Sequence, residues 1–143
     1  MAKLDHPIMH QDSRGGGDGY THRREKSWRK MGITFNGQFL KWRVFIECVK
    51  LQGHRCAVCG MTDASESLSA DHSHSSSDFR GALCLHCNHR AVGVVERFGR
   101  YRNARYTALV QAYLATPPAM LFRKQLMRVA NAPKIPKRSR GSI

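Results

Sequence analysis

The stretch that decides the fold runs from Cys56 to Asn88 and reads CAVCGMTDASESLSADHSHSSSDFRGALCLHCN. Cys56 and Cys59 form one Cys-x-x-Cys knuckle, and Cys84 and Cys87 form a second. Each knuckle points two thiolates at one ion, and two knuckles complete the tetrahedron that zinc prefers. A pair of disulfides is the alternative, but no signal peptide marks the chain as secreted. The spacing therefore predicts a structural zinc with no open position for catalysis.

The residues between and beside the knuckles supply candidate catalytic groups. Asp71-His72-Ser73-His74 lies inside the loop that the knuckles enclose, and Asn88 directly follows the last cysteine. Oxygen ligands from Asp71 and Asn88 suit Mg²⁺ or Mn²⁺ and leave positions for water and phosphate. His72 can act as a general base, because an ordinary imidazole is largely neutral at physiological pH. An isolated Asp-His pair is usually solvated surface, but the flanking knuckles and Asn88 favour a catalytic site.

The number and distribution of charged residues predict the kind of molecule that the chain binds. Lys and Arg number 24 against 10 acidic residues, for a formal net charge of +14. The segment 100–143 contains basic residues and no acidic ones, whereas acidic residues outnumber basic ones over 56–99. This pattern predicts nucleic-acid binding around a metal-binding centre, and no basic amphipathic helix with aromatic anchors points to a membrane instead. The candidate DNA contacts are Arg80, Arg100, Arg102, Arg105, Lys134, Lys137, Arg138 and Arg140.

The chain contains no long apolar run and no signal peptide, so we expect an intracellular protein that is not secreted. Residues 1–31 are polar and glycine-rich and are expected to form a flexible basic arm. Thr34 or Asn36 is expected to cap a helix that ends near Gly53. Its apolar face would carry Phe39, Trp42, Phe45, Ile46 and Val49. Cys48, the odd cysteine of the five, is expected to be a buried, reduced thiol.

Short segments over 68–72 and 79–83 predict a β-hairpin, and a helix is expected over 87–98, closed by Gly99. Two further helices are expected over 101–115 and 117–131, the second capped by Thr116. These elements give an α+β fold, mainly helical, around a zinc-stapled finger. The expected parts are the arm 1–31, a zinc-stabilised catalytic core with its leading helix over 32–99, a basic helical extension over 100–131 and a disordered basic tail over 132–143.

The run from Asp71 to Asn88 resembles the recombination endonuclease VII family of His-Me finger (HNH) nucleases. The residues that carry the resemblance are Asp71-His72-Ser73-His74 and Arg80-Gly81-Ala82-Leu83-Cys84-Leu85-His86-Cys87-Asn88. Met31-Gly32-Ile33-Thr34 is similar to the lead-in of that family. The resemblance implies a ββα-metal DNA endonuclease in which Asp71 and Asn88 bind one ion and His72 activates water.

The resemblance further implies that His74 helps to hold the scissile phosphate, that cleavage leaves 5′-phosphate and 3′-hydroxyl ends, and that a dimer acts on branched or distorted DNA. One departure concerns an acidic residue of the family, whose position is Ala91 here; Glu96 is a candidate substitute. Ser73 and Ser77 also stand where the family often has Asp and Gly.

Several alternatives stay open at this point. Arg80 is either a phosphate clamp or the partner of Asp78. Tyr101, Tyr106 and Tyr113 either stack on bases or belong to the core, which is the more common role for aromatic residues at helical spacing. Competing functions are a non-catalytic zinc-ribbon module that only grips DNA, a homing or nicking HNH enzyme, and a component of a phage or mobile-element assembly.

Overall fold

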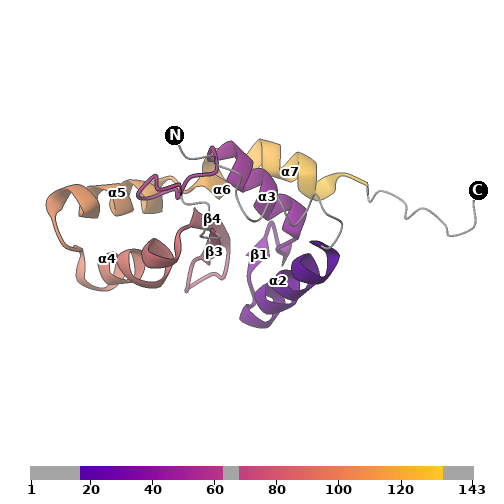
Figure 1. Cartoon of the computed structure of the whole chain (residues 1–143), viewed down its shortest axis with the longest axis horizontal. Coiled ribbons are helices and arrows are strands. Elements are labelled where there is room, and N and C mark those ends of the chain that lie inside the picture. Colours follow the sequence, from indigo (N-terminus) through magenta and orange to yellow (C-terminus); the bar gives the residue numbers. More distant parts are fainter. Residues whose placement is uncertain (1–16, 63–67, 134–143) are drawn as a thin grey trace, which may run out of the picture.

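The computed structural model describes residues 17–62 and 68–133, and it has an α+β fold (Figure 1). The expected disordered tail lies mostly outside these residues, as do Lys134, Lys137, Arg138 and Arg140. No helix within the described ranges is long and apolar enough to cross a membrane. The elements are α2 (Gly17–Met31), β1 (Thr34–Phe35), β2 (Gln38–Phe39), α3 (Trp42–Leu51), β3 (Ser69–His72), β4 (Phe79–Leu83), the π-helical turn η1 (Cys87–Ala91), α4 (Val92–Phe98), α5 (Ala104–Ala115), α6 (Pro118–Leu121) and α7 (Arg123–Asn131).

The predicted β-hairpin is confirmed and lies at the centre of the molecule (Figure 1). Strands β3 and β4 pair antiparallel, with Asp71 opposite Gly81 and His72 opposite Phe79. The register therefore skips Arg80, which forms a β-bulge. A bulge re-aims a side chain at the point where it interrupts the ladder. The sequence pattern predicts both strands, but it does not predict this local change of register.

Helix α3 carries the expected buried face, with Trp42, Phe45, Ile46 and Val49 in the core. It begins later than expected, because residues 34–39 form the β1–β2 hairpin instead of a helical turn. Asn36 and Gly37 have φ values of 53° and 78°, the left-handed pair that a two-residue hairpin turn requires. Phe39 lies on this hairpin and is 47% exposed, so its assignment to the buried face is wrong.

The end of α3 supports the central hairpin through a side chain. Gln52, the C-cap residue, accepts a hydrogen bond from the Ala82 amide at 2.9 Å and donates one to the Ala82 carbonyl at 2.8 Å. The amide side chain thus takes the place of a neighbouring strand residue beside β4. This pairing satisfies both backbone groups of Ala82, which is fully buried.

The expectation of a flexible arm is wrong for Gly17–Met31, which form helix α2. Trp28 is 3% exposed, and its ring stacks on that of Trp42 with 5.9 Å between centroids. The Glu25 carboxylate accepts a hydrogen bond of 2.6 Å from the Trp42 amide, at the start of α3. Although α2 lacks a sustained apolar period, one large aromatic side chain and one helix-capping contact dock it against α3.

The helices expected after Gly99 are present with shifted boundaries. Helix α5 begins at Ala104, because the Asn103 side chain accepts a hydrogen bond from the Tyr106 amide. The helix expected over 117–131 is broken at Phe122 into α6 and α7, and its N-cap is Pro117 rather than Thr116. Helix α6 packs on β4, and α7 packs on α3, so the last helices close over the central hairpin.

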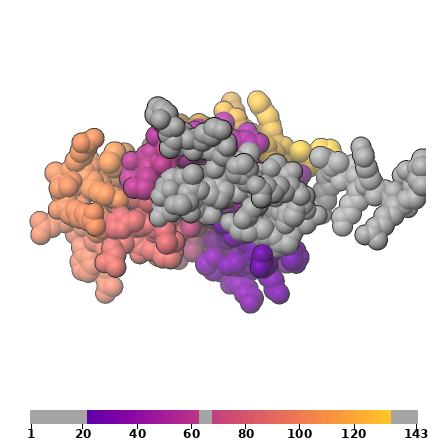
Figure 2. Space-filling model, viewed as in Figure 1, coloured from indigo at the N-terminus to yellow at the C-terminus, as the bar shows by residue number. Residues whose placement is uncertain are grey.

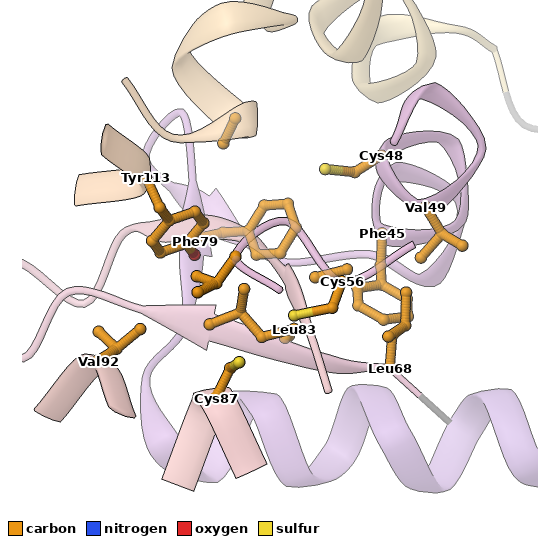
Figure 3. Close-up of a cluster of buried hydrophobic side chains, with 14 of the residues drawn as sticks. Phe45, Cys48, Val49, Cys56, Leu68, Phe79, Leu83, Cys87, Val92 and Tyr113 are labelled. Carbon is orange, nitrogen blue, oxygen red and sulfur yellow. The ribbon is translucent and has the colours of Figure 1, made fainter. Parts of the chain in front are cut away.

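One buried cluster joins all of these parts. It contains residues from Trp28 on α2 to Leu126 on α7, and it passes through both strands of the central hairpin. Figure 3 shows its middle, where Phe45, Phe79, Leu83 and Tyr113 converge. The expected boundary between residues 99 and 100 therefore does not divide the core. In Figure 2, α5 lies at one end of the molecule and α2 lies on the lower side.

We predict that Trp28→Ala lowers the free energy of unfolding by about 3 to 5 kcal/mol, the usual cost of removing a buried tryptophan side chain. The matched control is Met31→Ala on the same helix, because Met31 is 51% exposed and should change stability by less than about 0.5 kcal/mol. Denaturant unfolding of the zinc-loaded chain measures both. Equal, small effects from the two substitutions would mean that α2 is not docked.

Candidate active site and metal centre

The four cysteines of the two knuckles lie together, as predicted. Their Sγ atoms are all within 4.8 Å of one another, and the Sγ atoms of Cys59 and Cys84 are 3.8 Å apart. A tetrahedral zinc with bonds of about 2.3 Å places its sulfur atoms about 3.8 Å apart. All five cysteines of the chain are free, so the two knuckles are not joined by disulfides. The cluster fits a structural zinc.

The charge balance of the cluster also suits a cation. Hydrogen bonds from Cys84 and Cys87 lower the pKa of the Cys56 thiol to about 2. The hydrogen bond to Cys56 raises the pKa of Cys84 to about 12. These opposite shifts have one cause, the repulsion between neighbouring thiolates, which disfavours a second thiolate beside the first. A divalent cation removes this restriction by letting each thiol ionise as a ligand.

Backbone contacts place both knuckles beside β4. In the first knuckle, Gly60 has a φ of 72° and donates its amide to the Cys56 carbonyl, and the Ala57 amide donates to Ala82 of β4. The second knuckle follows β4 directly and leads into η1. Both ends of the loop that contains Asp71 and His72 are thus fixed to one strand.

Two tyrosines of the C-terminal half contact the second knuckle and its surroundings. The Tyr106 hydroxyl lies 3.0 Å from the Cys87 Sγ atom. The Tyr101 hydroxyl lies 2.8 Å from His86 Nε2, so His86 has a partner other than the cysteine cluster. Tyr101 and Tyr113 are buried. These contacts assign the tyrosines to the interior rather than to base stacking.

Cys48, also as predicted, is fully buried and reduced.

Asp71 is the one buried charged residue in the described part of the chain, at 4% exposure. Its Oδ2 atom accepts hydrogen bonds from Arg80 Nε at 2.8 Å and from the Tyr113 hydroxyl at 2.6 Å. Its Oδ1 atom accepts one from Arg80 Nη2 at 3.2 Å. Burial, followed by the nearby Asp71 charge, raises the pKa of Tyr113 well above its usual value, so this hydroxyl remains the donor.

The pairing of Arg80 with Asp78, offered by the sequence as the alternative to a phosphate clamp, is wrong. Arg80 pairs with Asp71 and, through Nη1, with Glu96 at 3.0 Å. Asp78 instead accepts a hydrogen bond from the Thr34 hydroxyl. Glu96 therefore reaches the site as the second partner of Arg80. The bulge at Arg80 is what brings this guanidinium beside Asp71, and no pattern in the sequence announces it.

His72 is half-buried at the end of β3, and its ring centroid lies 5.4 Å from that of the exposed His74. Burial and the charge of His74 lower the pKa of His72 below its usual 6.5. Asn88 is half-buried on the π-helical turn η1, which contacts β3. Such turns are frequent at functional sites. The two strands and η1 thus place Asp71, His72 and Asn88 in one region of the fold.

A groove of about 660 Å³ lies between the turn after β3 and the face of η1 and α4. Its lining includes His74, His89, Arg90, Glu96, Arg97 and Phe98. Sequence reasoning did not single out Arg90 and Arg97, although their spacing of seven residues places them on one helical face. The predicted contacts Arg100, Arg102 and Arg105 are exposed, but they lie near the α4–α5 loop, away from the central hairpin (Figure 1).

Comparison with known proteins gives one family. A family model described as recombination endonuclease VII matches residues 38–115, more than half of the chain. No curated protein and no solved structure matches. The matched range contains both knuckles, the central hairpin, η1, α4 and α5, and it excludes α2 and α7.

We predict that Cys59→Ser loses zinc and unfolds, because a structural zinc of this type contributes on the order of 10 kcal/mol to folding. Cys48→Ser is the matched control, since Cys48 is buried away from the cluster and should keep a full equivalent of metal. Metal analysis of purified protein, together with circular dichroism, checks both. A Cys59→Ser chain that retains stoichiometric zinc would contradict the assignment.

Proposed function

We propose a mechanism for a chain that belongs to the recombination endonuclease VII family and is therefore a DNA endonuclease, which hydrolyses phosphodiester bonds. The proposed mechanism uses one metal ion and is centred on Asp71, His72 and Asn88. The observation that carries this proposal is the buried Asp71 carboxylate next to a half-buried His72 with a lowered pKa. A module that only grips DNA requires neither group, and the family match also speaks against that alternative.

The residues present fit a divalent ion of the Mg²⁺ or Mn²⁺ class. A carboxylate oxygen of Asp71 and the amide oxygen of Asn88 are hard donors, which these ions prefer, and two protein ligands leave room for water and phosphate. When bound, such an ion stabilises negative charge on the scissile phosphate and its leaving oxygen. The four cysteine thiolates are assigned to zinc and the oxygen donors to the second ion, so the two metals differ in ligand type.

In this mechanism His72 accepts a proton from the attacking water. Its lowered pKa keeps the imidazole neutral at physiological pH, so one ring nitrogen is free to take the proton. His74 is exposed beside it and is proposed to donate a hydrogen bond to a phosphate oxygen. Its ring lines the groove and makes a T-shaped contact with the ring of His72.

The groove is proposed to hold the DNA backbone. Arg90 and Arg97 line it together with His74, and cationic side chains along such a groove supply affinity for phosphates that does not depend on sequence. Arg100, Arg102, Arg105 and the basic residues Lys134, Lys137, Arg138 and Arg140 are proposed to extend these contacts. As the preferred substrate we propose branched or distorted DNA, cut by a dimer.

We predict that His72→Ala lowers the cleavage rate by about 10²- to 10⁴-fold, the usual contribution of a general base, while zinc content and DNA binding stay close to those of the parent. His22→Ala on the exposed face of α2 is the matched control and should leave the rate unchanged. The assay uses Mg²⁺ with a four-way junction and a linear duplex of the same sequence, and faster cleavage of the junction is expected. A His72→Ala rate within tenfold of the parent would argue against this base.

We also predict the pH dependence of kcat/KM. Activity requires neutral His72, so the rate rises with pH through the pKa of this group and then levels off. Because burial lowers that pKa, the midpoint of the rising limb should lie below pH 6.5. Initial rates at subsaturating DNA and constant ionic strength measure it. A midpoint above this value would show that another group controls proton transfer.

A further inference from the structure

We infer that Tyr113 is a positioning residue for Asp71: with Arg80 Nε, its hydroxyl occupies Oδ2 and leaves Oδ1 as the atom that binds the divalent ion. This inference rests on the proposed function, in which Asp71 is a ligand of that ion. It assigns a role to helix α5, which lies after the ββα elements in the chain. Tyr113 itself need not contact DNA or the ion.

The hydrogen bonds to Asp71 carry the inference. A carboxylate oxygen offers about two lone pairs. At Oδ2 both are used, by Tyr113 at 2.6 Å and by Arg80 Nε at 2.8 Å. At Oδ1 only one is used, by Arg80 Nη2 at the longer distance of 3.2 Å. The remaining lone pair of Asp71 therefore lies on Oδ1.

The fold holds the Tyr113 ring close to the hairpin. Tyr113 is 4% exposed and points from α5 into the core (Figure 3). Opposite Asp71 in the sheet stands Gly81, where an added Cβ would lie 3.2 Å from Tyr113 Cε1 and 2.9 Å from Pro118 Cδ. The missing side chain makes room for both rings. Gly81 of the hairpin therefore allows α5 to lie close to β4.

A saturated Oδ2 has a consequence for metal choice. It restricts Asp71 to binding through one oxygen, which suits the strict octahedral shell of Mg²⁺ or Mn²⁺. Removal of the Tyr113 hydroxyl frees a lone pair of Oδ2 on the side away from Arg80, so the ion can bind at either of two positions on Asp71, while Arg80 still keeps both oxygens from binding one ion. Ca²⁺ has a flexible oxygen shell and tolerates such a displacement better than ions that require a near-ideal octahedron. Tyr113 should therefore favour the smaller ions over Ca²⁺.

The experiment is calorimetric titration of zinc-loaded full chain, without DNA, with Mn²⁺ and separately with Ca²⁺. Tyr113→Phe keeps the ring and removes only the donor. We expect its Mn²⁺ affinity to fall by about 10- to 100-fold, as for other residues that orient a metal ligand, and its Ca²⁺ affinity to fall less. Tyr101→Phe is the matched control, because it removes a buried hydroxyl that bonds to His86 and leaves Asp71 untouched.

An unchanged Mn²⁺ affinity in Tyr113→Phe would overturn the inference. So would an equal loss for both ions, since a general loosening of the site does not discriminate between them. Asp71→Asn separates this result from a failure of the proposed function. If Asp71→Asn binds Mn²⁺ as tightly as the parent, Asp71 is not a ligand and the proposed mechanism fails. If Asp71→Asn loses binding while Tyr113→Phe does not, only the role of Tyr113 is wrong.

Discussion

The four-cysteine cluster is the constraint on which the rest of the structure depends. It joins the segment before β3 to the segment after β4, so the hairpin between them is closed at both ends. Because Asn88 follows Cys87 directly, the same cluster sets the start of η1 relative to β3. In a chain of 143 residues with one modest core, such a link contributes free energy that packing alone supplies with difficulty.

Burial of Asp71 sets a second requirement, which the fold meets with residues from distant parts of the chain. An ionised carboxylate out of water is costly unless it is paired and hydrogen-bonded. Arg80 supplies the opposite charge from β4, Tyr113 supplies a neutral donor from α5, and Glu96 on α4 accepts hydrogen bonds from the remaining donors of Arg80. The candidate site is therefore a polar network that ties α4 and α5 to the central hairpin.

The sequence predicts the features whose cause is local. Cysteine spacing predicts the zinc cluster, turn residues predict the β3–β4 hairpin, and periodicity predicts most of the buried face of α3. It does not predict contacts that depend on tertiary packing. The bulge at Arg80 and the approach of Tyr113 to Asp71 arise only when the helices dock. The positions of Asn36 and Gly37 show a different case, because this pair is a hairpin signal that the helical periodicity around it obscured.

The contact of Tyr113 with Asp71 also bears on the order in which the protein is completed during synthesis. The chain leaves the ribosome from its N-terminal side, so residues near the N-terminus become available first. Both zinc knuckles and the hairpin between them emerge before residue 113, and α7, which covers α3, emerges later still. A nascent chain can thus bind its structural zinc while its buried carboxylate still lacks the Tyr113 donor. With the role that we infer for Tyr113, the second metal site is completed late in translation, when α5 reaches the hairpin.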